Sequence, residues 1–217
     1  MPKIALSGVP EADQLLSDDP LALLIGMVLD QQIPLEHAFH SPHELTKCLG
    51  RRPSAEQLAS FDPDELAAIF AQPRALHRFP GSMAKRVQDM CRVVVDEYGG
   101  DAAAVWTGAT SGQELYKRVA ALPGFGQQKA RIFVALLGKQ LGVRPEGWRE
   151  ASEPYGAEGS RMSVADITDP ESLLQVREYK RAKKAEAKAA VSSPTDEPAA
   201  KNGHFVRKMR PVGEGLS

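Results

Sequence analysis

Apolar residues recur along the first two thirds of the chain at the three- and four-residue spacing of amphipathic helices. The clearest case is residues 82–98, where five apolar side chains follow this spacing: Met83, Val87, Met90, Val94 and Val95. Residues 21–29 are apolar on all sides, which indicates a buried helix. No segment shows the strict alternation of a half-buried strand. The pattern therefore predicts an all-α protein.

Residues that favour helix ends stand at the borders of these segments. Asp19 followed by Pro20 is an N-cap with proline at the first helical position. Gly50 and the pair Gly99-Gly100 are expected to end helices. Three further runs have the arrangement of a capping box: residues 41–44, 62–65 and 111–114.

The chain changes character after Leu141. Residues 142–161 mix Gly, Pro and Glu and predict a long loop, after which Asp169-Pro170 begins another helix. From residue 190 the sequence has almost nothing to bury. We therefore expect one helical domain over residues 1–189 and a disordered tail over residues 190–217.

The composition mainly excludes classes of protein. No apolar run approaches the roughly 18 residues of a membrane span, and the first residues lack a secretory signal, so we expect a cytoplasmic protein that does not bind membranes. The net charge of −1 does not by itself indicate a polyanionic partner. Basic residues nevertheless gather in the last third of the chain, at Arg177, Lys180, Arg181, Lys183 and Lys184.

Neither the cysteines nor the histidines have the spacing of a metal site. Cys48 and Cys91 are far apart, which gives no zinc or iron–sulfur framework. His37, His40 and His43 have no carboxylate or cysteine at ligand spacing, and we expect surface histidines. We therefore predict neither a metal nor a cofactor.

The most informative segment is residues 121–130, Ala-Leu-Pro-Gly-Phe-Gly-Gln-Gln-Lys-Ala, between two helical patterns. The two glycines permit a tight hairpin, and Leu122 is apolar and would anchor it to the core. Free N–H groups at the start of the second helix suit a DNA phosphate. The residues expected to bind DNA here are Gly124, Phe125, Gly126, Gln127, Gln128 and Lys129, with Phe125 also expected to anchor the hairpin.

Together with residues 19–32, this hairpin resembles the helix-hairpin-helix-GPD superfamily of DNA glycosylases, which includes endonuclease III and adenine glycosylase. The resemblance covers residues 19–141. It implies a two-lobed fold in which the middle helices form one lobe, the chain ends form the other, and DNA lies across the cleft. It also implies a glutamine at the DNA interface, where Gln31 or Gln32 would fill the gap left by a flipped base or hydrogen-bond the orphaned partner base.

The chain departs from the family at the position of the lyase lysine, which falls on Gln128. Lys129 comes one residue later, and this shift turns a helical side chain by about 100 degrees. Schiff-base lyase chemistry is therefore not expected. The cysteines of the iron–sulfur members are also absent.

The family's essential carboxylate follows the hairpin, and three residues compete for this role. Counting alone gives Glu146, whereas the local context Ser-Val-Ala-Asp-Ile favours Asp166. Asp169 is a third candidate, although Pro170 makes it a helix cap. Trp148 and Tyr155 lie in the preceding loop and are candidates for stacking on an extruded base.

The sequence thus predicts a base-excision repair protein, a monofunctional DNA glycosylase that acts as a monomer on double-stranded DNA. The alternative is a non-catalytic helix-hairpin-helix protein that binds double-stranded DNA. In a third interpretation the hairpin is only a turn in a protein-interaction scaffold.

Overall fold

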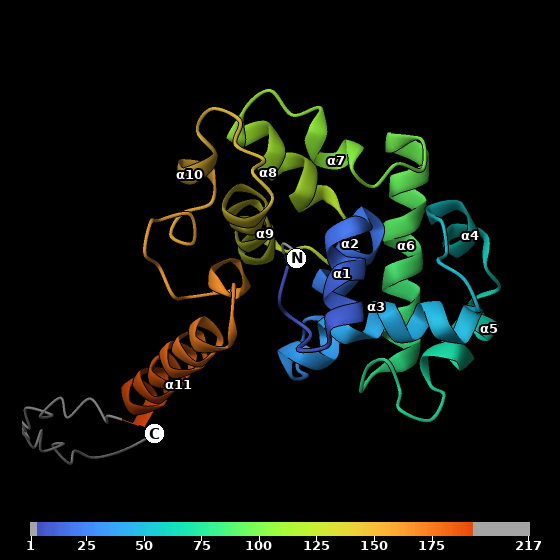
Figure 1. The fold of residues 1–217 in the computed structure, drawn as a ribbon, viewed down its shortest axis with the longest axis horizontal. Helices are drawn as coiled ribbons and strands as arrows, with labels where there is room; N and C mark the ends of the chain where they lie inside the picture. Colours follow the sequence, from blue (N-terminus) through green and yellow to red (C-terminus); the bar gives the residue numbers. More distant parts are fainter. Residues whose placement is uncertain (1–3, 193–217) are drawn as a thin grey trace, which may run out of the picture.

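A computed structural model describes residues 4–192 of the chain. Over this range the chain forms eleven α-helices and one 3-10 helix, and no strand (Figure 1). The all-α prediction is confirmed. The helices are α1 (Pro10–Asp18), α2 (Pro20–Leu29), α3 (Leu35–Leu49), α4 (Ala55–Ser60), α5 (Pro63–Phe70), α6 (Pro80–Tyr98), α7 (Ala104–Thr107), α8 (Gly112–Ala121), α9 (Gln127–Gln140), α10 (Trp148–Ala151), η1 (Val164–Asp166) and α11 (Pro170–Ser192).

Four helices begin at the predicted capping residues, namely α2, α5, α8 and α11. The Asp19 side chain accepts hydrogen bonds from the backbone N–H groups of Leu21 and Ala22 at the start of α2. Asp62 caps α5 and Ser111 caps α8 in the same way. These caps are local devices, because each satisfies N–H groups within three residues of itself.

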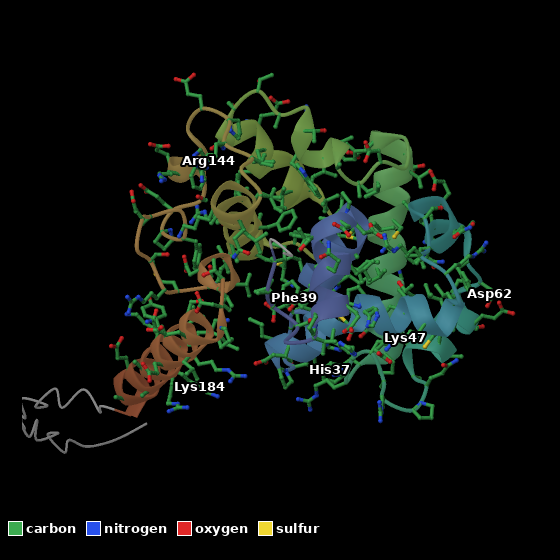
Figure 2. The ribbon with its side chains drawn as sticks, viewed as in Figure 1. His37, Phe39, Lys47, Asp62, Arg144 and Lys184 are labelled. Atoms are coloured by element: carbon green, nitrogen blue, oxygen red, sulfur yellow. The ribbon has the colours of Figure 1, made fainter. Side chains whose placement is uncertain are left out.

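The cap predicted for residues 41–44 is wrong. Helix α3 begins at Leu35, so that Pro42 lies inside it. The Ser41 hydroxyl donates to the carbonyl of His37 instead of capping a new helix. The fully buried ring of Phe39, labelled among the central helices in Figure 2, packs against α2 ahead of the proline. This burial outweighs the backbone hydrogen bond that Pro42 removes.

Contacts between helices fall largely into two groups. Helices α2, α3 and α6 hold the first group together, with α1 packed on α2 and α3, and with α4 and α5 packed on α6. Helices α8 and α9 hold the second group, which includes α10 and η1, and α7 links it to α6. Figure 1 shows α8, α9 and α10 on one side of α2, and α4, α5 and α6 on the other. The limits of the predicted central lobe, residues 19–141, stay a prediction.

The segment 142–161 is not a continuous loop, because it contains the short helix α10. Trp148 is buried there, and its ring lies directly over Gly138 of α9. Its predicted role in stacking on a base is therefore wrong, since this ring is part of the packing between α9 and α10.

Helix α11 continues through Ser192, beyond the predicted start of the tail at residue 190. The rest of the predicted disordered tail, residues 193–217, lies outside the described residues. No helix between residues 4 and 192 has both the length and the apolar character to cross a membrane.

The close approach of Trp148 to Gly138 gives a test of this packing. An added Cβ at Gly138 would lie 2.3 Å from two carbon atoms of the ring, so Gly138→Ala forces the ring to move. Overpacking outweighs the gain in helix propensity, and we expect the free energy of unfolding to fall by about 1–2 kcal/mol in chemical denaturation. The control is Gly81→Ala in α6, where nothing lies within 4 Å of the added atom. Equal stability of the two variants would contradict this account.

Candidate DNA interface

The predicted hairpin joins α8 to α9 across residues 122–126. Gly124 has φ of +93°, a conformation that favours glycine. A Cβ there would also lie 3.1 Å from side-chain atoms of Val28 and Arg86. Phe125 is buried and packs edge-to-face on Phe133, with 5.6 Å between ring centroids. Its side chain therefore anchors the hairpin and is withdrawn from any DNA surface.

The start of α9 presents free N–H groups to solvent. Gly126 is the N-cap, has φ of −85°, and provides no side-chain cap. Gly126, Gln127 and Gln128 are exposed, and the first hydrogen bond within the helix runs from Ala130 to Gly126. The preceding amides are therefore available to an anion, and the helix dipole adds positive potential at the same point.

Lys129 does not extend into solvent from this helix. Its ammonium nitrogen donates to the backbone carbonyls of Met27, at 2.6 Å, and Val28, at 3.2 Å. Burial lowers the pKa of Lys129 to about 8, while Asp30 acts in the opposite direction. The two carbonyls form the negative end of α2 and favour the charged form. The residue thus ties the hairpin to α2.

The two glutamines after α2 differ in how firmly the protein holds their side chains. The Gln31 side chain donates to the carbonyl of Val28 and accepts from Arg86. The buried His77 ring also lies 2.8 Å from the Gln31 carbonyl. Gln32 is exposed, with φ of +54°. Gln31 is therefore fixed in the protein, whereas Gln32 is the glutamine that is free to reach a partner.

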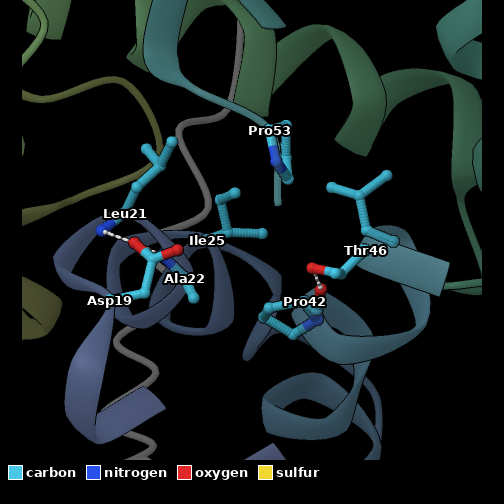
Figure 3. A pocket seen from close by; sticks show the side chains of 8 residues that line it. Asp19, Leu21, Ala22, Ile25, Pro42, Thr46 and Pro53 are labelled. Carbon is cyan, nitrogen blue, oxygen red and sulfur yellow. Dashed lines mark hydrogen bonds between the residues drawn. The ribbon is translucent and has the colours of Figure 1, made fainter. Parts of the chain in front are cut away.

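A pocket of about 460 Å³ lies beside the hairpin. Its volume falls in the range of ligand sites. By contrast, the cavity between α2 and α3 near Asp19 (Figure 3) has about 10 Å³, which suffices for roughly one water molecule. The residues that line the hairpin pocket are Met27, Asp30, Gln31, Gly124, Gly126, Gln127, Gln128, Lys129 and Ile132. Most of the residues predicted to bind DNA thus meet at one cavity.

Asp30 is the carboxylate in this pocket, and the sequence prediction missed it. It is half-buried, and burial raises the pKa of its carboxyl group, while Lys180 and Lys129 lower it. A usable signal was present: Asp30 is the first charged residue after the apolar run 21–29 and directly precedes Gln31.

Asp166 occupies a different environment and does not line the hairpin pocket. One of its carboxylate oxygens lies 2.6 Å from the ammonium nitrogen of Lys139 and also accepts from the Ser160 hydroxyl. The other oxygen accepts from the backbone N–H groups of Met162 and Ser163. The side chain is 4% exposed. These contacts order the turn around η1.

The two alternative carboxylates lie elsewhere on the surface. Glu146 is exposed, and its backbone carbonyl accepts from the N–H of Gly112. Asp169 accepts from the N–H of Ser172 and caps α11, as its neighbour Pro170 suggested. Its hydrogen bonds with Ser172 and Thr168 lower the pKa of its carboxyl group.

Gln128, at the position of the family's lyase lysine, donates to the hydroxyl of Tyr155 at 2.8 Å. Tyr155 is half-buried and packs at the edge of the core. This bond links the start of α9 to the segment that follows it. Whether Tyr155 stacks on a base stays a prediction.

The expectation that no carboxylate accompanies the histidines is wrong. Glu44 lies one turn after His40 on α3, and its carboxylate is 2.9 Å from the His40 ring. His40, His43 and Glu44 place potential ligand atoms within 4.8 Å of one another. The same Glu44 oxygen also pairs with Lys47 at 2.9 Å, so a cation already occupies it. None of the three residues lines the hairpin pocket.

The comparison with protein families agrees with the prediction made from the hairpin. The model of the HhH-GPD superfamily of base excision DNA repair proteins matches residues 25–195. The chain is also similar to a solved structure of a trapped endonuclease III–DNA covalent intermediate, an estranged-adenine complex. The two chains are 18% identical with a TM-score of 0.39, over 80% of this chain and 94% of that one. None of the curated proteins compared with the chain matches it.

The contacts of Asp166 predict that replacing this residue lowers the stability of the protein. Asp166→Asn weakens the ion pair with Lys139 and replaces one acceptor oxygen by a donor, so we expect a loss of about 2 kcal/mol in the free energy of unfolding. The matched control is Asp169→Asn, which exchanges two good N-cap residues and should change stability by only a few tenths of a kcal/mol. Urea denaturation of both variants measures the difference. An Asp166→Asn variant as stable as the control would show that this network contributes little.

Proposed function

The chain belongs to the HhH-GPD superfamily of base excision DNA repair proteins, and we propose that it is a monofunctional DNA glycosylase. The observation that carries this proposal is the position of the pocket. The free amides at the start of α9 open beside a cavity of ligand size that holds the carboxylate of Asp30. A phosphate held at those amides would place its own nucleotide at the mouth of the cavity.

Binding to duplex DNA would rely on the hairpin backbone. The amides of Gln127 and Gln128 would accept a phosphate without reading the base sequence. Lys129 contributes its positive charge close by while it remains bonded to α2. The exposed Gln32 would enter the gap that a flipped base leaves in the duplex. These contacts position the DNA, and the pocket receives the base.

Base removal requires that the nucleotide leave the stack, at a cost of a few kcal/mol. Breaking the N-glycosidic bond builds positive charge on the sugar, which a carboxylate can stabilise. The sequence assigns this role to Asp166, with Glu146 and Asp169 as alternatives. Strand cleavage through a Schiff base is not part of the proposal, because Gln128 stands at the lysine position and the Lys129 amine faces backbone carbonyls.

The second candidate is a non-catalytic protein that binds double-stranded DNA. The observation that favours it is the environment of Asp166, whose carboxylate accepts four hydrogen bonds from the protein itself. A carboxylate in this state is poorly placed to meet a sugar. The two candidates share the hairpin contacts and differ in whether base is released.

Gly126 allows a test of phosphate binding that leaves the fold intact. Its φ suits any residue, and nothing lies within 4 Å of an added Cβ. Aspartate is a better N-cap than glycine by a few tenths of a kcal/mol. Gly126→Asp should therefore keep or raise the melting temperature, while its carboxylate occupies the amides and repels phosphate. We expect about a tenfold loss of duplex affinity in fluorescence anisotropy, equivalent to about 1.4 kcal/mol.

The control for this experiment is Gly126→Asn, which has almost the same shape and no charge. It should lose less affinity than Gly126→Asp, and the difference should shrink as salt is added. Wild-type affinity in the aspartate variant, with the fold retained, would remove the hairpin from the DNA interface.

Catalysis is tested by release of free base from duplexes that carry uracil, hypoxanthine, 8-oxoguanine or a mismatched base. We expect release from at least one duplex without strand cleavage, and no covalent complex on borohydride treatment. A borohydride-trapped complex would contradict the monofunctional assignment. Duplex binding without release from any substrate would favour the non-catalytic candidate.

A further inference from the structure

Asp30 is the unusual acid of the hairpin pocket. It is the C-cap of α2, and its backbone N–H completes that helix by donating to Gly26. Its side chain, in contrast, accepts no hydrogen bond from any group within residues 4–192. A carboxylate that is half-buried and has no donor is costly to maintain, because nothing replaces its lost hydration. Such a group is available to a ligand.

Asp30 also occupies a boundary between two hollows. It lines the hairpin pocket, and it lines a neighbouring groove of about 300 Å³ between the start of α3 and α11. The other residues of this groove are Ile33, Pro34, Leu35, Glu36, Leu173, Val176, Arg177 and Lys180. The carboxylate is thus open to the region between the hairpin and the C-terminal helix, where α2 ends.

The surrounding charges favour the ionised form of Asp30. Burial raises the pKa of its carboxyl group above the ordinary value, and the charges of Lys180 on α11 and Lys129 on α9 reduce that rise. The other charged groups nearby have partners of their own. Glu36 and Arg177 form an ion pair across the groove, and Arg86 donates to the Gln31 side chain.

We propose that Asp30 is the carboxylate that stabilises the sugar cation in the hairpin pocket. This inference rests on the proposed glycosylase function. As the C1′–N bond breaks, its electron pair leaves with the base, and C1′ shares the positive charge with the ring oxygen. Water then adds to C1′ and gives a proton to the Asp30 carboxylate, while the departing base takes up a proton from solvent.

Asp30 fits this role better than Asp166 because of what each carboxylate already binds. The oxygens of Asp166 accept from Lys139, Ser160 and two backbone N–H groups, and a sugar would have to displace these donors. Asp30 has no such donor to lose. Its two lysines act on it through charge without a direct ion pair, so both oxygens remain free to face a substrate.

The proposal can be tested without knowing which base is removed. The probes are two duplexes with abasic-site analogues, one with a cationic pyrrolidine and one with a neutral tetrahydrofuran. A carboxylate that stabilises a sugar cation should bind the pyrrolidine duplex at least about tenfold more tightly. Asp30→Asn should abolish this preference and keep the affinity for the tetrahydrofuran duplex. The matched control is Glu36→Gln, which removes an acid from the neighbouring groove and should keep the preference.

The outcomes of this binding experiment distinguish the role of Asp30 from the proposed DNA interface and from the proposed function. A preference that survives Asp30→Asn and disappears in Asp166→Asn would overturn the assignment and return the role to Asp166. Duplex binding with no preference in the wild type would overturn the inference and leave the proposed DNA interface standing. A wild type that binds neither duplex would overturn the proposed function itself.

The effect of Lys180 on the pKa of Asp30 is measured separately, through the pH dependence of the preference for the pyrrolidine duplex. Lys180 favours the ionised carboxylate, so Lys180→Met should raise the pKa of Asp30 and move the pH at which the preference is half lost upward. The control is Lys184→Met, an exposed lysine on the same helix (Figure 2). It removes one charge from α11 without acting on Asp30. An unmoved midpoint in Lys180→Met, or an equal shift in both variants, would contradict the role of Lys180.

Discussion

Lys129 connects the two helices on which the site depends. Its ammonium group donates to the last carbonyls of α2 from the first turn of α9, and these two positions are about a hundred residues apart in the sequence. The contact satisfies backbone groups that a helix end leaves without partners. It also places a positive charge against the negative end of the α2 dipole. The hairpin amides, Gln31 and Asp30 therefore share one pocket because the end of α2 and the start of α9 are held together.

The packing around the hairpin supports this contact from the other side. Phe125 and Phe133 lie edge-to-face, which fixes the turn to the body of α9. Gly124 brings the turn so close to α2 that a Cβ would meet Val28. A larger residue at this point would separate the helices that Lys129 joins. The geometry of the site thus depends on the close approach of the hairpin backbone to α2, which also sets the positions of the polar groups.

Asp166 and Asp30 illustrate how the same side chain serves different purposes. Asp166 is surrounded by donors and orders the turn at η1 through them. Asp30 has no donor within residues 4–192, and the charges of Lys129 and Lys180 offset part of the rise in pKa that burial causes. The oxygens of Asp166 are occupied by donors from the protein and contribute to stability. The oxygens of Asp30 remain open to the pocket. This contrast is the reason to direct functional experiments at Asp30.

The sequence alone determined what local rules govern. The apolar run 21–29, the caps at Asp19 and Ser111, and the glycine-rich hairpin all depend on neighbours within a few residues, and the structure has them as predicted. Tertiary packing decided the rest. Helix α3 runs through Pro42 because Phe39 is buried against α2, and Trp148 joins the core because Gly138 leaves room for it. Which acid faces the pocket depends on where α2 ends relative to α9, and residue spacing contains no information about that distance.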